Sequence, residues 1–347
     1  MIIVVYRIFI LLTLTVYSIS ASAQTLGGNA VFSFLKQANT AQLSALGGLN
    51  ITSGGKDIGM AFHNPALLRK EMHQQVNTSF NAFIAGISNY SISAGYHLDN
   101  AKTNIGFGVN YLNYGTMDQT DAAGNIIGRF NPRDYVVQVM ASRTHKEKWW
   151  YGATIKFIHS GYGQFRSSGM AMDIGINYHD EENGLQAGVT VKNIGTQFNT
   201  YDRSGRKDEL PFDLQAGVTK KLKNAPMQFS LTLHELHRFN NFYNDTTFRA
   251  GEGEDDFSGK NTLQKIFNHI VLGVQFFPDE KLEISTGYHF QRRQELNGFN
   301  ITNGLNGFSA GAGIILPKLQ VRYATGFYQR QLFHQFSLNF NLKGGNL

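Results

Sequence analysis

The feature that most constrains this chain is a period-two alternation of apolar and polar residues. It recurs from about residue 75 to the end of the 347-residue sequence. The last segment reads HQFSLNFNL over residues 334–342, where uncharged polar residues alternate with Phe336, Leu338, Phe340 and Leu342. Because a strand places successive side chains on opposite faces, this pattern predicts a strand with one apolar and one polar face.

Fourteen segments share the alternation, and each has ten to twelve residues. A strand that crosses a membrane needs roughly 9–11 residues, whereas strands of globular proteins average about five or six. The segments lie at 75–84, 88–98, 104–114, 134–144, 149–159, 168–178, 184–194, 211–221, 226–237, 268–277, 281–291, 306–316, 319–328 and 333–342. Their number and length favour a membrane β-barrel, since an even count of antiparallel strands closes without an edge.

The connections between these segments alternate in length. When the segments are numbered along the chain, each even-numbered segment from the second to the twelfth is joined to the next one by a short turn, such as HDEEN (179–183). The intervening connections are longer and lie at 115–133, 160–167, 195–210, 238–267 and 292–305. The first and last of these alternate connections, at 85–87 and 329–332, are short exceptions. Short turns on the periplasmic side and long loops outside are typical of outer-membrane barrels.

Composition agrees with a membrane barrel. Charged residues make up 16% of the chain, against roughly 25% in ordinary soluble domains, and glycine and phenylalanine are abundant. Aromatic residues near the segment ends, among them Tyr114, Trp149, Trp150 and Tyr328, predict girdles at the membrane interfaces. The absence of cysteine excludes disulfides, thiol catalysis and cysteine-based zinc sites. The net charge of +6 is diffuse, so no nucleic-acid partner is expected.

The N-terminal residues differ in pattern from the rest of the sequence, and we therefore predict that the whole chain has three parts. Residues 1–23 have the Arg7 charge, the apolar stretch IFILLTLTV and the small residues ASA of a secretory signal peptide, cleaved after about Ala23. Residues 24–74 lack strand alternation, and Asn39 or Thr40 could cap a short helix that ends at Gly47-Gly48. The sequence thus predicts an N-terminal plug segment, at 24–74, ahead of a transmembrane barrel at 75–347.

Within this barrel, Phe336, Leu338, Phe340 and Leu342 are expected to face lipid on the closing strand. Ser337, Asn339 and Asn341 would then face the lumen, and the strand would pair with the first strand near 75–84. The predicted fold class is therefore all-β, a 14-stranded antiparallel transmembrane β-barrel.

No motif predicts catalysis, a cofactor or a metal. In HELH, His234 and His237 are three residues apart on a strand end, whereas zincins need histidines four apart on a helix, so polar residues at the barrel rim are expected. The acidic run GEGEDD on the longest loop lacks the spacing of a calcium hand, and a solvated acidic patch is expected there. As part of a long external loop, it is also a candidate partner-binding loop, which contains Glu252, Glu254, Asp255 and Asp256. We therefore nominate no catalytic residue.

The sequence of a predicted turn ahead of the first strand segment resembles that of a known protein family. In FHNPALL (62–68), Asn64 and Pro65 force a turn and the two leucines can pack it onto a wall. Asn64-Pro65-Ala66 resembles the plug turn of fatty-acid-transporter-type (FadL-like) outer-membrane proteins. More specifically, four stretches resemble PorQ-like outer-membrane components of the type IX secretion system of Bacteroidota, in the FadL-like/PorV-like superfamily: 27–48, 62–68, 192–198 and 210–236.

The resemblance implies a non-enzymatic subunit of the cell-surface attachment complex in the outer membrane. Its partners there would be a sortase-like protease, a second barrel that shuttles cargo, and a tethered surface protein. One departure is that Phe340 is followed by NLKGGNL, whereas a barrel's last strand usually ends the chain on an aromatic residue.

Two alternatives remain open on the sequence alone. A FadL-type transporter of hydrophobic compounds would share the barrel and plug but need an apolar pocket or a lateral opening. A secreted soluble β-sandwich that binds glycans would need the fourteen apolar faces to meet one another.

Overall fold

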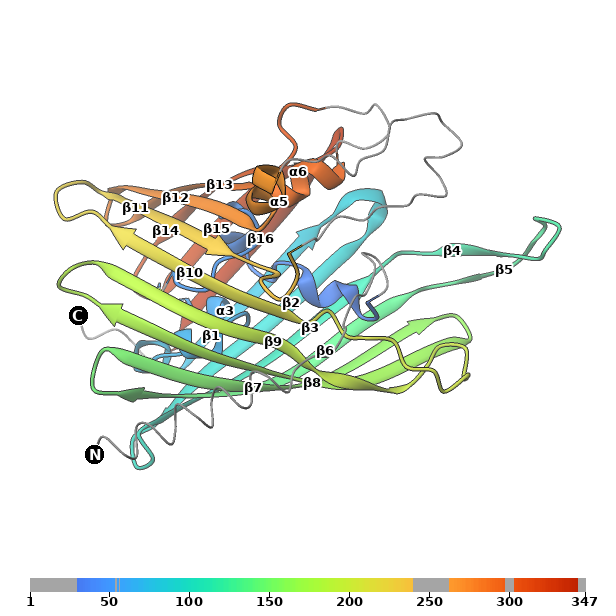
Figure 1. Ribbon diagram of the computed structural model, residues 1–347, viewed down its shortest axis with the longest axis horizontal. Coiled ribbons are helices and arrows are strands. Elements are labelled where there is room, and N and C mark those ends of the chain that lie inside the picture. Colours follow the sequence, from blue (N-terminus) through green and yellow to red (C-terminus); the bar gives the residue numbers. More distant parts are fainter. Residues whose placement is uncertain (1–29, 54, 56, 240–261, 297–302, 343–347) are drawn as a thin grey trace.

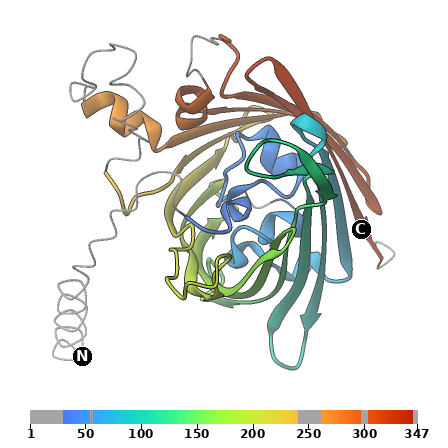
Figure 2. The same cartoon turned by 90° about the vertical axis from the view of Figure 1, so that its right-hand side faces the viewer.

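A computed structural model of the chain describes residues 30–53, 55, 57–239, 262–296 and 303–342. Fourteen antiparallel strands form a closed barrel (Figures 1 and 2). They are β1 (Gln75–Ala82), β2 (Ser88–Leu98), β3 (Thr103–Asn113), β6 (Arg133–His145), β7 (Trp149–Tyr162), β8 (Phe165–Asp180), β9 (Leu185–Asn199), β10 (Asp213–Lys221), β11 (Met227–Leu233), β12 (Ile270–Asp279), β13 (Leu282–His289), β14 (Phe308–Ile315), β15 (Leu319–Tyr328) and β16 (Gln331–Asn341). The predicted fold class is confirmed, and each of the fourteen alternating segments contains one strand.

The barrel closes where its last strand meets its first. β16 pairs with β1 from Gln75 opposite Asn341 to Ala82 opposite His334. Every other barrel strand pairs with the next one in the chain, except that β3 pairs with β6 across an inserted hairpin. Closure leaves no strand edge unpaired, which is the condition for a sheet to lie in lipid.

The side chains of the wall alternate in exposure. On β2, Tyr90 and Ile92 are exposed on the outside, whereas Asn89, Ser91 and Ser93 are buried inside. Outer aromatic rings pack on one another across strands, as Tyr323 and Phe336 do with centroids 5.0 Å apart. Large apolar residues therefore cover the outside while neutral polar residues face inward, which is the reverse of a soluble protein and suits a lipid surrounding. The soluble sandwich is wrong, because the apolar faces do not meet one another.

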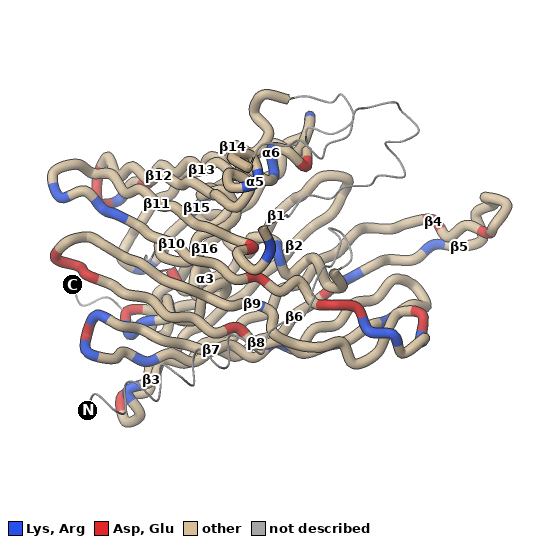
Figure 3. Tube along the Cα trace, viewed as in Figure 1, with Lys and Arg blue, Asp and Glu red and all other residues tan. Residues whose placement is uncertain are grey.

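Charges gather at the two ends of the barrel, and the wall between them is mostly uncharged (Figure 3). One end, here the turn end, carries six short connections, those of β2–β3, β6–β7, β8–β9, β10–β11, β12–β13 and β14–β15. The opposite end is the loop end.

A segment of the chain lies inside the barrel, where Figure 2 shows it within the ring of strands. This luminal segment (residues 30–53, 55 and 57–72) contains η1 (Ser33–Lys36), α2 (Ala41–Ala45), α3 (Ile58–Ala61), η2 (Pro65–Leu67) and η3 (Lys70–Met72). Most of its side chains are buried, among them Leu43, Ile58 and Leu67. That it acts as a plug stays a prediction, as does the division of the chain at residues 24 and 75; residues 1–23 lie outside the described part.

Helix α2 has the predicted boundaries. The Thr40 side chain accepts a hydrogen bond from the Leu43 amide at 3.2 Å, and Gly47 and Gly48 end the turn with φ near 88°. The helix end lies close against β13: a Cβ on Gly287 would stand 2.1 Å from the Gly47 nitrogen. Glycine on the inner face of the wall thus permits backbone-to-backbone contact with the luminal segment.

Three loop features differ from the predictions. The β7–β8 connection is not long: β7 continues to Tyr162 and β8 begins at Phe165, because the alternation extends beyond the length that a membrane requires. The 115–133 loop forms a separate hairpin of β4 (Met117–Thr120) and β5 (Ile126–Phe130), which extends past the loop end (Figure 1). Three short helices also occupy connections: η4 (Ile84–Gly86), α5 (Thr262–Asn268) and α6 (Phe290–Leu296).

The predicted aromatic girdle is incomplete. Trp149 and Tyr151 are exposed, but Trp150 lies between them on the inner face, where the Arg69 guanidinium stands 5.5 Å from its ring centroid. Tyr114 and Tyr328 line cavities at the loop end. Alternation moves every second residue to the lumen, so neighbouring aromatics cannot all face lipid. None of the helices in the described part of the chain is both long and apolar enough to span a membrane.

Candidate functional site

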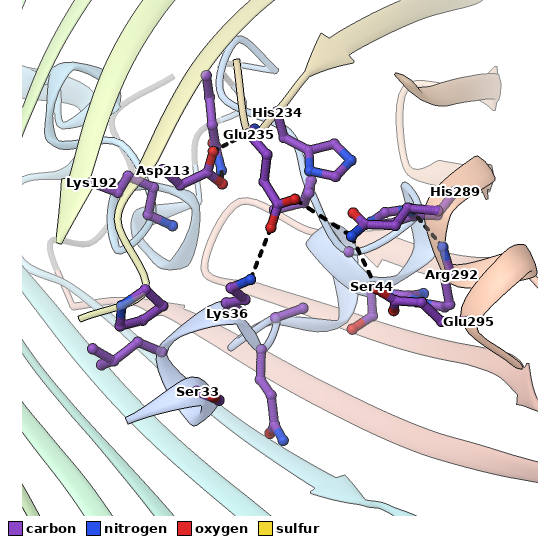
Figure 4. Close-up of a pocket in the computed structure, with 18 of the residues that line it drawn as sticks. Ser33, Lys36, Ser44, Lys192, Asp213, His234, Glu235, His289, Arg292 and Glu295 are labelled. Carbon is purple, nitrogen blue, oxygen red and sulfur yellow. Dashed lines mark hydrogen bonds and ion pairs between the residues drawn. The ribbon is translucent and has the colours of Figure 1, made fainter. Parts of the chain in front are cut away.

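A polar cavity of about 290 Å³ lies at the loop end between the luminal segment and the wall (Figure 4). The luminal segment contributes Lys36 and Ser44, and the ends of β11 and β13 contribute His234 and His289. Helix α6, which directly follows β13, adds Arg292 and Glu295. Charges of both signs therefore line one space, and they come from elements far apart in the sequence.

An ion pair joins the two sides of this cavity. Lys36 Nζ lies 2.9 Å from Glu235 Oε1, and Figure 4 shows the two side chains pointing toward each other. Glu235 is itself fixed, because its backbone amide donates to Asp213 Oδ1 at 2.6 Å. Gln291 Nε2 donates weakly to the second Glu235 oxygen at 3.5 Å. The pair thus connects the luminal segment to the rim after β11.

Two carboxyl groups of the cavity have pKa values displaced in opposite directions. Burial acts to raise the pKa of Glu235, but the charge and hydrogen bond of Lys36, together with the charges of His234 and Arg238, lower it overall. Burial raises the pKa of Glu295, and the nearby charge of Glu235 raises it further. The cavity therefore holds one carboxylate stabilised in its ionised form and one stabilised in its protonated form.

Three histidines lie near the cavity. The rings of His234 and His289 have centroids 4.9 Å apart, and His269 Nδ1 is 2.8 Å from the His234 carbonyl oxygen. Among the described residues, no three histidine, aspartate or glutamate side chains form a cluster that could hold a metal. The HELH motif does lie at the rim, but His234 and Glu235 are buried in the cavity wall, and His237 packs on Phe212 with centroids 4.8 Å apart.

Deeper in the lumen, buried ion pairs fix the luminal segment to the wall. Arg322 on β15 contacts Asp57 of the luminal segment at 2.9 Å and Glu283 on β13 at 3.2 Å. Asp57 also accepts from Asn77 at 2.9 Å and from the Gly59 amide at 2.8 Å. Each charge is therefore paired and hydrogen-bonded, as burial requires. A second buried pair, Lys156 with Asp173, lies within the wall at 2.6 Å.

The predicted plug turn is packed against the wall. Asn64 Oδ1 accepts from the Ala66 amide at 3.0 Å, and Asn64 Nδ2 donates to the Ile51 carbonyl at 2.7 Å. A Cβ on Gly175 of β8 would stand 2.0 Å from Asn64 Oδ1, so glycine there permits the close approach. Pro65 begins η2, and both Pro65 and Ala66 are buried. The turn is thus positioned by its own asparagine and by the wall.

The four resembling stretches contact one another inside the barrel. Lys36 of the first stretch pairs with Glu235 of the fourth, as described above. His63 of the second stretch lies 2.8 Å from Lys192 of the third, between Nδ1 and Nζ. Asn193 of the third donates to the Pro211 carbonyl of the fourth at 2.9 Å. Stretches separated by up to about two hundred residues in sequence thus form one connected interior.

The remaining predicted residues are placed as follows. Phe336, Phe340 and Leu342 are exposed on the outside, Leu338 is partly exposed, and Ser337 and Asn339 are buried. Asn341 is only partly buried. Contact of the four apolar residues with lipid stays a prediction. The candidate partner-binding residues Glu252, Glu254, Asp255 and Asp256 lie outside the described part of the chain.

A second cavity, the aromatic pocket, also lies at the loop end and has a volume of about 430 Å³. The luminal segment contributes Phe32 and Phe34 to its lining, and the wall and loops contribute Tyr114, Asp134, Tyr162 and Tyr201. The sequence analysis missed this pocket, because its residues come from six separate elements and loops. Only the aromatic residues near the strand ends were a signal for it.

The β4–β5 hairpin carries exposed apolar side chains beyond the barrel. Ile126 is 64% exposed and Ile127 is 62% exposed. The two strands pair only with each other, so both outer edges of the hairpin are unpaired. Proteins usually shield unpaired strand edges and exposed apolar side chains, because both favour association with other chains. Where they are left exposed, they mark a site that another molecule covers.

The similarity of this chain to known proteins is seen among solved structures. No family model matches the chain, and no curated protein matches it. A structure described as the TodX monoaromatic hydrocarbon channel covers 88% of this chain and 97% of its own length, at 12% identity and a TM-score of 0.49. The outer-membrane protein Omp33 of Acinetobacter baumannii aligns over 77% of this chain and 97% of its own, at 8% identity and a TM-score of 0.37. A structure described as KdgM porin covers 77% and 98%, at 5% identity and a TM-score of 0.34.

The architecture itself indicates where the protein resides. A closed barrel of fourteen antiparallel strands, apolar outside and polar inside, is built for the outer membrane of a Gram-negative bacterium.

Proposed function

We propose that this protein is a non-enzymatic outer-membrane component of the type IX secretion system attachment complex, where it tethers surface partners. The partners would be a sortase-like protease, a shuttle barrel and a surface protein, and the chemistry on cargo would belong to the protease. The observation that carries the proposal is a lumen filled by the luminal segment together with an apolar hairpin that projects from the loop end.

The filled lumen supports docking over diffusion through a pore. The luminal segment is held by the buried pair of Arg322 with Asp57 and by the partly exposed pair of Lys36 with Glu235. Removing one member of such a pair is costly, so the segment is held firmly in the resting state. A barrel of this kind offers its outer loops, rather than its interior, to other proteins.

The hairpin supports a protein partner. It extends past the membrane-spanning strands, so lipid does not cover Ile126 and Ile127. Exposed apolar residues on an otherwise polar loop mark interaction sites, and an unpaired strand edge can add a strand from a partner. The four linked stretches that resemble PorQ-like proteins support the choice of this complex as the place where the partner would be found.

Replacement of the hairpin tests the proposal. In a strain that makes the protein, the double substitution Ile126→Ser with Ile127→Ser should leave the heat-modifiable barrel in the outer membrane. It should release cargo from the cell surface into the medium. The matched control, Gln119→Ser with Thr120→Ser on the partner strand β4, should retain cargo. Cargo attachment that stays unchanged in the isoleucine variant and after replacement of residues 117–130 by a Gly-Ser loop would overturn docking through the hairpin.

A second candidate function is FadL-type transport of hydrophobic compounds, and the aromatic pocket favours it. Six aromatic side chains and Val31 line a space of the size that small ligands occupy. Transport through the barrel would require the luminal segment to move, if this segment acts as the predicted plug. Uptake of a radiolabelled fatty acid that is equal in a deletion strain and its parent would exclude this candidate.

A further inference from the structure

The lining of the aromatic pocket includes one carboxylate, that of Asp134. Asp134 is 2% exposed and lies where β6 begins at the loop end. Tyr114 Oη donates to Asp134 Oδ2 at 2.6 Å, and Tyr162 Oη donates to the same oxygen at 3.3 Å. Ser160 donates to Oδ1 and in turn accepts from Tyr201 Oη at 2.6 Å. Three tyrosines and one serine thus converge on one acidic group.

This carboxylate has no cationic side chain bonded to it in the described part of the chain, and His159 on β7 is a basic group whose charge acts on it from a distance. No lysine, arginine or histidine in the described part of the chain forms an ion pair with it, unlike the buried Asp57 and Asp173. Arg133 precedes it in the strand, but alternation directs Arg133 to the exposed face. Neutral hydroxyl donors lower the cost of a buried charge without balancing it, so a cation in the pocket would be attracted.

The aromatic residues favour the same ligand. The rings of Tyr114 and Tyr162 have centroids 5.7 Å apart at an angle of 45°, and those of Tyr162 and Tyr201 are 5.7 Å apart at 74°. Rings set at different angles around a space form an aromatic cage, and the negative faces of such rings attract ammonium groups within about 6 Å. A purely apolar ligand would gain from the rings but would leave the carboxylate unbalanced.

We propose that the aromatic pocket binds a small alkylammonium cation from the external medium. The methyl or methylene groups of the cation lie against the tyrosine and phenylalanine rings, and Asp134 supplies the opposite charge. The volume of about 430 Å³ accommodates a cation of choline size. This binding site is independent of the docking function, because the hairpin residues Ile126 and Ile127 are not part of its lining.

Calorimetric titration of the full-length protein in a non-ionic maltoside detergent tests the proposal. The probes are choline and its neutral isostere 3,3-dimethylbutan-1-ol, which has the same shape without the charge. We expect choline to bind and the isostere to bind at least tenfold more weakly. Asp134→Asn should weaken choline binding at least tenfold, whereas the control Asp202→Asn, an exposed carboxylate in a loop at the same end, should leave it unchanged.

Loss of choline binding in Asp134→Asn could also result from misfolding, so a second pair of variants provides an independent test. Tyr201→Phe retains the ring and should retain choline binding within a few fold, whereas Tyr201→Ala should lose it. The proposal is overturned if choline does not bind, if Asp134→Asn folds and binds choline as wild type does, or if the Tyr201 variants bind alike. Equal binding of the isostere also overturns it and would instead support the transport of hydrophobic compounds.

Discussion

Arg322 is the residue on which the position of the luminal segment most depends. It is buried between two carboxylates, Asp57 of the luminal segment and Glu283 of β13, and no other cation of the described chain pairs with either one. Loss of the guanidinium would leave both carboxylates buried without a counter-charge. Such a loss usually costs about 3–5 kcal/mol, far more than the loss of an exposed pair.

Arg322→Met should therefore lower the free energy of unfolding in urea by about 3–5 kcal/mol. Adding Asp57→Asn and Glu283→Gln to this variant should recover much of the loss, since the uncompensated charges are then gone. The control Arg129→Met breaks the exposed pair with Asp118 and should cost less than about 1 kcal/mol. Equal losses in the Arg322 and Arg129 variants would contradict a buried network.

The two carboxyl groups of the polar cavity predict opposite pH dependences. The folded pKa of Glu235 is lowered, so its ionisation stabilises the protein above the ordinary value of 4.5, and this stability disappears as the pH falls through the lowered value. The folded pKa of Glu295 is raised, so its ionisation costs stability at pH values above the raised value, and the cost disappears as the pH falls to about the ordinary 4.5.

The free energy of unfolding against pH should separate these effects. At neutral pH, Glu235→Gln should be less stable than wild type and Glu295→Gln more stable. Both differences should shrink on acidification, that of Glu295→Gln as the pH approaches 4.5 and that of Glu235→Gln only below it. Parallel curves for the three proteins from pH 3 to 7 would show that neither group is perturbed.

Single residues were also where prediction from sequence was weakest. The alternation indicated a lumen of neutral polar residues, and Ser337 and Asn339 are indeed buried there. It gave no signal for Arg322 and Glu283, two charges on inner faces about forty residues apart. Their pairing depends on which strands become neighbours and on where the luminal segment places Asp57. Pairing of that kind is a property of the closed barrel and is not encoded in any local pattern.

At the scale of elements, the strands were predictable because each one separates lipid from a polar interior. β2 matches its predicted segment, and β16 differs from its segment only by residues at the ends. The β4–β5 hairpin was not predicted, because strands exposed on both faces carry no period-two signal. The lengths of β7 and β8 were underestimated for the related reason that they extend beyond the lipid.

Strand β16 provides the sharpest test of the outer face. Leu338 lies within the strand, paired with Thr78 and Val321, whereas Leu342 follows the strand end and is 68% exposed. Arginine at the bilayer midplane costs about 2–4 kcal/mol and near the interface about 0–1 kcal/mol. Leu338→Arg should therefore destabilise the barrel in lipid vesicles much more than Leu342→Arg, as measured by urea titration. If both variants folded as wild type does, the assigned face would be wrong.

At the scale of the whole molecule, the parts agree with a closed barrel that holds the luminal segment inside and carries an added hairpin at one end. The wall supplies the closure, and Lys36 with Glu235 and Arg322 with Asp57 fix the luminal segment at two depths. The β4–β5 hairpin and the two cavities lie at the loop end, which we predict to face the outside of the cell because the opposite end carries the short turns. The alternation of short turns and long loops in the sequence predicted this orientation of the barrel. The cavities could not be predicted, because their lining residues come together only in the folded protein.

Co-purification tests the central claim, that this outer end docks secretion partners, most directly. The protein is isolated by an affinity tag from outer membranes solubilised in mild detergent, beside the Ile126→Ser, Ile127→Ser variant and an untagged strain, and its companions are identified by mass spectrometry. We predict that a sortase-like protease and a large surface protein accompany the wild-type protein and are depleted with the variant. Isolation of an intact, heat-modifiable barrel without either companion would contradict the account.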